Sequence, residues 1–349
     1  ETGSCVHVYA YPDVTCPDDL SVYENELPRT LSGALPTGGD YSGPGVAGHV
    51  FDPAVAGVGA HEITYTYTDQ NGCMNGCSFD ITVKTACVEI EAYVYLEGAV
   101  IDPDGSDTYA LPMRTDLNAK RLLPGQRYKD PFLGILYTSP GQPYNVAPWF
   151  YAGPKGALYD SGVDPLNGDT PYGATVVDWV LVSLRATADG EGGPVCQAVA
   201  LLHNDGSLVF VDGPLACCDL DMYGEYYLVI EHYSHLLVMS PEPLPILNGK
   251  IVYDFRIQQS YINDPFQFGY SGQKEVFPGV FVMFGGNGQQ ENALDDDVDI
   301  NFDDGTFWQE ENGKFNLYLF GDYNLNGDVN FSDRTLWEMN NGTFTSVLS

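Results

Sequence analysis

The chain has 349 residues, enough for two or three compact domains, and carries 48 acidic against 14 basic side chains. Its formal charge of −34 repels nucleic acids and anionic membranes, which argues against both as partners and favours cations. The 39 glycines, 23 prolines and 24 tyrosines favour a mainly β protein with many turns. Because no apolar stretch has the length of a membrane span and no signal segment opens the chain, we expect a soluble, processed or excised form.

From Cys16 to Cys87, short alternating runs are separated by turns rich in glycine and proline. Residues 63–67 alternate at period two, Asn71-Gly72 has the composition of a hairpin turn, and residues 79–83 alternate again. These features predict an immunoglobulin-like β-sandwich over residues 1–87.

The segment from Ser42-Gly-Pro-Gly45 to Tyr65-Thr-Tyr-Thr-Asp-Gln-Asn-Gly-Cys73 resembles the immunoglobulin-like repeats of large secreted and surface proteins of the Bacteroidetes. This resemblance implies a spacer or adhesive module without catalytic residues.

Strand-like runs continue after Val88 and predict a second, larger β-sandwich over residues 88–290. The first run alternates over residues 88–97, which indicates a half-buried sheet face. Asn204-Asp-Gly206 is a predicted turn, and further strands are predicted at 175–185, 198–203, 208–211, 226–232, 236–240, 251–256 and 276–284. Three of its segments resemble a region that precedes a calcium loop near the C-termini of Bacteroidetes surface proteins: Val177-Asp-Trp-Val-Leu-Val182, Leu201-Leu-His-Asn-Asp-Gly206 and Glu231-His-Tyr-Ser-His-Leu-Leu-Val-Met239. This resemblance implies no particular activity.

The segment Asp322-Tyr-Asn-Leu-Asn-Gly-Asp-Val-Asn-Phe-Ser-Asp333 fits the D-x-[DN]-x-[DN]-G-x5-[DE] calcium pattern at every defined position. Calcium takes hard oxygen ligands at this spacing. The predicted donors are the side chains of Asp322, Asn324, Asn326 and Asp333, the Asp328 carbonyl, and a water held by Asn330. Gly327 permits the sharp turn, and residues 331–339 read as the exiting helix with Phe331, Leu336 and Met339 buried.

A related copy precedes this loop at a constant offset, with Asp299 matching Asp328 and Trp308 matching Trp337. Ala293 and Val298 stand where the first ligand and the glycine belong, so a second calcium would be held more weakly; the alternative is a solvated acidic run. The upstream oxygen donors are Asp295, Asp297, Asp299, Asn301 and Asp304. These tandem units resemble dockerin modules, which implies a small α-helical calcium-binding tail over residues 291–349. The repeat is longer than ordinary dockerin spacing, so cohesin binding does not follow.

The eight cysteines form an even set without the paired C-x2-C units of a zinc site: Cys5, Cys16, Cys73, Cys77, Cys87, Cys196, Cys217 and Cys218. Together with the calcium pattern they indicate a secreted, extracellular setting in which disulfides are the default. We expect Cys196 to pair with Cys217 or Cys218, and the N-terminal cysteines to pair mainly among themselves.

No catalytic motif is present, so no catalytic residue, no organic cofactor and no enzymatic activity are predicted. His232 and His235 would point to opposite faces of a continuous strand unless a bend intervenes, which favours packing over a metal site. Aromatic side chains gather between Leu123 and Ala174, around Trp149. They either stack on sugars or, as we favour, pack against the sandwich.

The sequence therefore predicts an extracellular, calcium-stabilised structural or adhesive protein of a cell-surface appendage or large adhesin. Its expected partners are other surface-protein subunits, a cell-surface or glycan ligand, or further copies of the chain. The alternative is a carbohydrate-binding or accessory domain of a secreted glycan-active enzyme.

Overall fold

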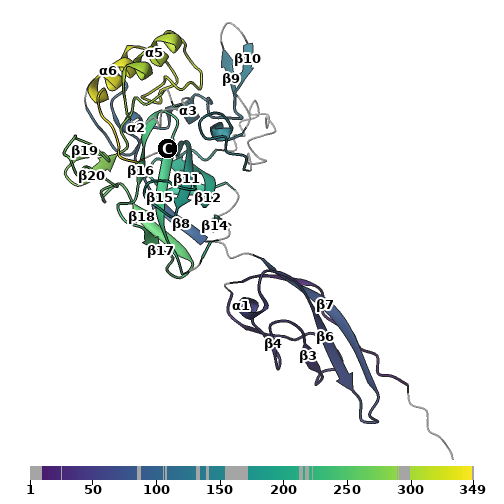
Figure 1. The fold of residues 1–349 in the computed structure, drawn as a ribbon. Helices are drawn as coiled ribbons and strands as arrows, with labels where there is room; N and C mark the ends of the chain where they lie inside the picture. Colours follow the sequence, from purple (N-terminus) through teal and green to yellow (C-terminus); the bar gives the residue numbers. More distant parts are fainter. Residues whose placement is uncertain are drawn as a thin grey trace, which may run out of the picture. The chain divides into compact units, whose positions relative to one another are not determined.

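The computed structural model describes residues 10–24, 26–84, 88–104, 106, 108–130, 134–138, 141–153, 172–211, 215–216, 220–221, 223–288, 290 and 299–347. The protein is mainly β, as its composition predicts. Contacts between Cα atoms divide it into two compact units, one formed by the described residues up to 84 and one by those from 88 onward (Figure 1).

The first unit contains two sheets around one apolar core. Its predicted hairpin is confirmed, because strands β6 (Gly59–Thr68) and β7 (Met74–Lys84) pair along their length. In the turn between them, the Asp69 carboxylate accepts the Asn71 and Cys73 N–H groups. Ile63 and Phe79 are buried, as the period-two pattern predicts. One sheet is β1 (Leu20–Tyr23), β7 (Met74–Lys84), β6 (Gly59–Thr68) and β3 (Asp40–Ser42); the other is β2 (Arg29–Thr30), β5 (Val50–Phe51) and β4 (Val46–Ala47), followed by helix α1 (Pro53–Ala56).

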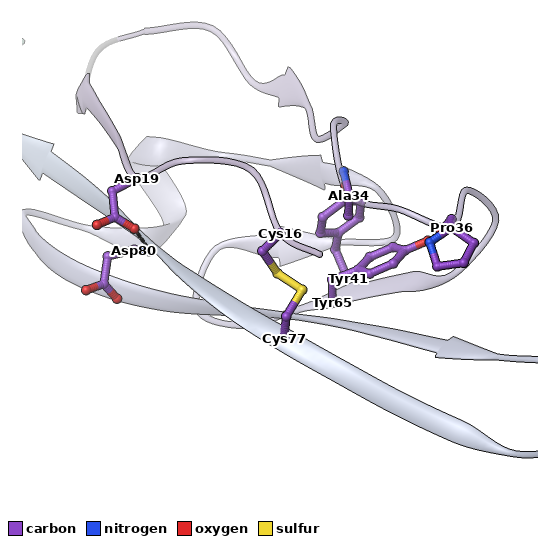
Figure 2. Close-up of a disulfide and its surroundings, with 8 residues drawn as sticks. All are labelled: Cys16, Asp19, Ala34, Pro36, Tyr41, Tyr65, Cys77 and Asp80. Atoms are coloured by element: carbon purple, nitrogen blue, oxygen red, sulfur yellow. Dashed lines mark hydrogen bonds between the residues drawn. A yellow bond between two sulfur atoms is a disulfide. The ribbon is translucent and has the colours of Figure 1, made fainter. Parts of the chain in front are cut away.

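A disulfide between Cys16 and Cys77 ties the segment before β1 to β7 (Figure 2). Beside it, Tyr41 and Tyr65 pack with ring centroids 4.8 Å apart. The Tyr65 hydroxyl donates to the Pro36 carbonyl at 2.5 Å and accepts the Gly39 N–H at 2.7 Å, so a buried phenol fixes the turn before β3.

The cysteine prediction is confirmed in part. Cys16 and Cys77 pair within the N-terminal region, as expected, whereas Cys73 is a free thiol. Cys196 is disulfide-bonded, and the predicted partners Cys217 and Cys218 lie outside the described residues. Cys5 and Cys87 lie outside them as well.

The second unit is built on a six-stranded sheet whose central strand β11 is buried at every residue. Seven of its ten residues are apolar, and its polar residues Asp178, Ser183 and Arg185 are buried as well. The sheet runs β13 (Leu208–Phe210), β12 (Cys196–His203), β11 (Val176–Arg185), β15 (Glu225–His232) and β16 (His235–Met239), with β17 (Leu244–Pro245) also pairing with β15. A three-stranded sheet contains β14 (Leu215–Ala216), β8 (Val88–Tyr93) and β18 (Lys250–Asp254).

Two short hairpins complete the strands of this unit. The prediction of a single strand at 276–284 is wrong, because β19 (Lys274–Phe277) turns back into β20 (Val280–Val282). Pro278 has no N–H for a ladder and Gly279 takes a φ of +73°, so this pair forms a turn. The other hairpin pairs β9 (Arg127–Asp130) with β10 (Gly134–Tyr137).

Helices α5 (Phe302–Glu311) and α6 (Phe331–Asn340) lie side by side at one end of the second unit (Figure 1). Trp308 donates its indole N–H to the Asn330 carbonyl at 2.8 Å, and the equivalent Trp337 donates to the Asn301 carbonyl at 2.7 Å. The duplication in the sequence therefore becomes a reciprocal pair of contacts. The other helices that the structure describes in this unit are short: α2 (Glu97–Val100), α3 (Asp116–Ala119) and η1 (Pro143–Asn145).

The helix predicted at 331–339 is confirmed, but two of its three predicted core residues are wrong. Leu336 is buried, whereas Phe331 is 66% exposed and Met339 is 38% exposed. Asp333, Leu336 and Asn340 lie on the buried face of α6 at helical spacing. Asp333 hydrogen-bonds the preceding loop and Asn340 hydrogen-bonds Glu97, and these contacts place this face of the helix inward.

Candidate metal centre

The segment from Asp322 to Asp333 forms a tight loop that leads directly into α6. Gly327 has a φ of +85°, and a Cβ added there would lie 2.4 Å from Leu122 Cδ1. Both the backbone conformation and the close approach to Leu122 therefore require glycine, at the position where the pattern predicts it.

The carboxylates at the two ends of the loop are both buried. Asp322 accepts the Asn326 N–H at 3.0 Å and the Gly327 N–H at 2.6 Å. Asp333 accepts the Asn324 N–H at 3.0 Å and the Asn330 N–H at 2.8 Å. The backbone of the loop is thus wrapped around two anionic side chains.

These two carboxylates raise each other's energy when both are ionised. Burial, followed by repulsion from Asp333, raises the pKa of Asp322 well above its ordinary value of 3.8. Burial also raises the pKa of Asp333 to about 7, although the N–H groups that it accepts oppose the shift. A cation between the ends of the loop would remove this penalty.

The other loop donors are neutral oxygens. The Asp328 carboxylate accepts from Lys120 Nζ at 2.7 Å and from the Asn316 N–H at 2.9 Å, and its carbonyl, the predicted ligand, accepts from Asn330 Nδ2 at 3.1 Å. Asn324 is buried, and its Oδ1 accepts the Asn326 N–H at 3.1 Å. Two carboxylates with amide and carbonyl oxygens suit calcium. In the described part of the chain, no three His, Cys, Asp or Glu side chains converge as a metal cluster.

Asn330 has a second role besides the predicted one of holding a water. Its side-chain oxygen accepts the Ser332 N–H at 2.8 Å, which caps α6, and the Asn330 N–H in turn donates to the Asp333 carboxylate. This capping box fixes the Asp333 carboxylate against the start of the helix. Asn326 accepts the Asp328 N–H at 2.8 Å in the same way, as a local turn.

The upstream copy keeps the capping box but departs from the downstream loop before it. Asp304 is buried and accepts the Asn301 N–H at 2.8 Å, while Asn301 Nδ2 donates to Asp299 at 2.7 Å. The Gly288 N–H takes the place on Asp304 that the Asn324 N–H takes on Asp333. Gly288 and Asp304 are 16 residues apart in the sequence, whereas Asn324 and Asp333 are nine apart, so the upstream loop is longer. The predicted ligands Asp295 and Asp297 lie outside the described residues.

Residues far away in the sequence hold the downstream loop in place. The Arg114 guanidinium donates to the carbonyls of Asn324 at 2.6 Å and Gly98 at 2.9 Å. A Cβ on Gly98 would lie 2.0 Å from the Tyr323 carbonyl, so helix α2 approaches the loop as closely as glycine permits. Sequence reasoning missed the contacts of Lys120 and Arg114 with this loop, because nothing in their local pattern connects them to residues 322–333.

The C-terminal end of α6 is also fixed by a buried ion pair. Glu97 is fully buried and accepts hydrogen bonds from Asn340 Nδ2 at 2.6 Å and from Lys274 Nζ. Asn340 Oδ1 in turn accepts from Lys274 at 3.0 Å. The partners satisfy the buried charge, so the helix that follows the loop is anchored at both ends.

His232 and His235 face each other across the tight hairpin between β15 and β16, rather than lying on one strand. Their Nδ1 atoms are 3.0 Å apart, and His235 Nε2 accepts the Gly98 N–H at 3.0 Å. Burial, and then the neighbouring His232, holds the pKa of His235 well below 6.5. The Asp178 carboxylate lies next to this histidine pair, with its Oδ2 3.4 Å from His232 Nε2. These side chains are buried, which agrees with the predicted packing role.

The aromatic residues around Trp149 largely pack against the second unit, as the favoured reading expects. Tyr144 and Tyr172 are buried, and Trp149 sits edge-on to Tyr144 with ring centroids 5.0 Å apart. Trp149 also hydrogen-bonds the buried Glu231 carboxylate, so its indole is fixed from two sides. Phe150 projects, with 66% of its surface exposed, while Tyr159 and the side chain of Tyr128 lie outside the described residues.

Comparison with known families identifies the first unit. Residues 10–83 match the HYR domain. The HYR domain is an immunoglobulin-like extracellular domain found in surface proteins, and the match spans the sheets and the disulfide described above. No curated protein and no solved structure matches the chain. Within the described ranges, no helix combines the length and apolar character of a membrane span.

Proposed function

We propose that the protein is an extracellular, calcium-stabilised structural or adhesive component of a cell-surface appendage or large adhesin. The HYR domain supports the extracellular and adhesive part of this proposal, because such domains occur in surface proteins. The bound ion would be calcium, held by Asp322, Asn324, Asn326, the Asp328 carbonyl and Asp333.

The observation that carries the proposal is the buried pair Asp322 and Asp333. Two carboxylates out of contact with water, each surrounded by backbone N–H groups of one loop, form a site that is unfavourable when empty and ionised. Calcium supplies the missing positive charge and holds the loop ends together. Arg114 and Asn340 then connect the ordered loop and α6 to helix α2 of the second unit.

We also propose that the chain acts by binding and assembly, without catalysis. The polar clusters of the second unit, at Asp178 and at Glu97, are buried and their charges are satisfied by neighbouring side chains. They therefore contribute to packing and orientation. Because the chain is strongly acidic, divalent ions should strengthen any contact between like subunits.

An attachment assay tests this proposal. Cells or surfaces carrying the full chain would be compared in calcium and in a calcium chelator, together with Asp322→Ala and the control Glu310→Gln, which changes an exposed carboxylate on α5. We expect attachment or self-association to require calcium, to be lost in Asp322→Ala and to be retained in Glu310→Gln. Attachment that ignores both the chelator and Asp322→Ala would contradict the proposal.

A specific observation favours carbohydrate binding as the second candidate. Phe266 and Phe268 are 76% and 66% exposed, with ring centroids 5.7 Å apart. Their loop is fixed by Asp264, whose carboxylate accepts the N–H groups of Phe268 and Gly269, both at 2.7 Å. Exposed rings on a rigid loop can stack on sugar faces. A glycan array that gives signals lost in Phe266→Ala but kept in Phe150→Ala would favour this candidate.

A further inference from the structure

Three polar side chains from distant elements of the second unit meet at the end of α6. Glu97 is the first residue of α2, Lys274 is the first residue of β19, and Asn340 is the last residue of α6. Glu97 is fully buried and Asn340 is 1% exposed, while 22% of the Lys274 side chain is exposed. A lysine amine, a side-chain amide and a carboxylate are therefore in mutual contact, largely out of water.

The hydrogen bonds fix the orientation of the Asn340 amide. Its Nδ2 donates to Glu97 Oε2 at 2.6 Å and to the Gly285 carbonyl at 2.8 Å, and both of these partners are acceptors. Its Oδ1 accepts from Lys274 Nζ at 3.0 Å, and an ammonium can only donate. The lysine amine thus lies on the carbonyl side of the amide, and the Glu97 carboxylate lies beside the amide nitrogen.

The Glu97 carboxylate contacts both nitrogen atoms at once. Its Oε1 accepts from Lys274 Nζ, and its Oε2 accepts from Asn340 Nδ2. The Tyr109 hydroxyl donates to Oε1 at 2.7 Å and the Gly285 N–H donates to Oε2 at 3.1 Å, so each carboxylate oxygen is held in place. A carboxylate in this position can take a proton from the amine and give one to the amide nitrogen, as general acid–base catalysis requires.

We propose that Lys274 and Asn340 become joined by an amide bond between their side chains. Lys274 first gives a proton to Glu97, and the lone pair of its uncharged Nζ attacks Asn340 Cγ to form the new C–N bond. Glu97 then gives this proton to Nδ2, and the Cγ–Nδ2 bond breaks, so that Nδ2 leaves as ammonia with the bonding electron pair. The ammonia takes the surplus proton from Nζ and departs as ammonium, while Glu97 remains a carboxylate.

The structure supplies everything that this reaction consumes. The fold holds the amine and the amide together, so their encounter is intramolecular and needs no external substrate. No oxidant or cofactor enters the balance. The reaction occurs once in each chain and acts on no other molecule, so it is compatible with the assembling role proposed above and does not depend on it.

The bond closes a loop between two residues that are 66 positions apart. This loop contains α5, residues 322–333 and α6. A covalent link from the end of α6 to β19 keeps the candidate metal centre attached to the rest of the second unit even when calcium is removed. Such a link suits a protein that must hold its fold under tension.

Peptide mapping of the full chain tests the proposal. The chain is reduced, alkylated and digested with trypsin, which cleaves after lysine and arginine. The bond blocks cleavage after Lys274 and joins peptide 257–314 to peptide 335–349, which contains Asn340. We expect this branched peptide, about 17 Da lighter than the sum of its parts because one ammonia is lost. Succinimide formation at an Asn-Gly pair such as Asn341-Gly342 loses the same mass but leaves the peptides separate.

Matched variants assign the roles of the side chains. Lys274→Arg and Glu97→Gln should each abolish the branched peptide, because the first removes the attacking amine and the second removes the carboxylate that carries the proton. Lys250→Arg changes a lysine that pairs with Glu89 at 2.9 Å in the same unit, and it should leave the branched peptide in place. Circular dichroism reports which variants are folded. If one substitution prevents folding, the wild-type map and the other variant decide.

Two separate peptides in the wild-type digest would overturn the proposal, whatever the variants show. A branched peptide that persists in folded Glu97→Gln, or one that links Asn340 to another lysine, would overturn it as well. If the wild-type peptides are separate while calcium-dependent attachment persists, the amide bond falls and the proposed function stands.

Discussion

Without calcium, the stability of the loop should depend on pH through Asp333. The difference between its ordinary pKa of 3.8 and its raised value of about 7 corresponds to about 4 kcal/mol. Because the folded-state pKa is raised, this stability is fully present below pH 3.8 and is lost as the pH rises through about 7. In a calcium chelator, the free energy of unfolding should therefore fall by about 2.5 kcal/mol between pH 5 and pH 8 if the loop stays closed, because the rest of the loss occurs between pH 3.8 and pH 5.

Asp333→Asn isolates this effect, because the amide keeps one acceptor oxygen and cannot ionise. The assay is chemical denaturation in chelator and in calcium, at pH 5 and pH 8, for both proteins. We expect the loss of stability with rising pH in chelated wild type to be much smaller in the variant, and calcium to restore the wild type alone. The same pH dependence in both chelated proteins would refute the reasoning.

Three further predictions concern Gly327 in the loop, the buried face of α6, and the disulfide. Gly327→Ala should weaken calcium binding and lower the free energy of unfolding by roughly 1–3 kcal/mol, since it strains the backbone and meets Leu122; unchanged calorimetric affinity would contradict this. Leu336→Ala should lower the free energy of unfolding of the second unit by about 2–5 kcal/mol, and Phe331→Ala, at an exposed position, by no more than about 0.5 kcal/mol. Equal losses of the two variants in thermal denaturation would contradict the assignment of the buried face of α6. Replacing both Cys16 and Cys77 by serine should destabilise the first unit by about 4 kcal/mol, because the disulfide no longer closes a loop of 61 residues in the unfolded chain. Urea denaturation measures this loss.

Features that depend on neighbouring residues could be predicted from the sequence. Alternation at period two gives the β6–β7 hairpin with Ile63 and Phe79 inside. The fixed spacing of oxygen donors gives the loop at 322–333, with Gly327 at its positive φ. The strand before Asn204 and the helix after Asn330 begin or end close to their predicted positions.

Features that depend on contacts between distant residues could not be predicted. Glu97 meets Asn340 across 243 positions, and Arg114 meets Asn324 across 210, so no local pattern reveals either contact. The constant offset between the two copies also did not reveal that the upstream loop is longer. The Gly288 N–H donates to Asp304 as the Asn324 N–H donates to Asp333, but Gly288 does not stand at the sequence position that the offset assigns to Asn324. The burial of α6 was misjudged because apolar character alone does not show that Asp333 and Asn340 turn inward.

Calcium binding at the downstream loop is the claim on which the account depends most directly. Isothermal titration of the calcium-depleted full chain with calcium at pH 7.5 measures it, with Asp322→Ala as the variant and Glu310→Gln as the control. We expect saturable binding of at least one ion that is lost in Asp322→Ala and kept in Glu310→Gln. Binding that is equally strong in Asp322→Ala, or no binding by the wild type, would contradict it.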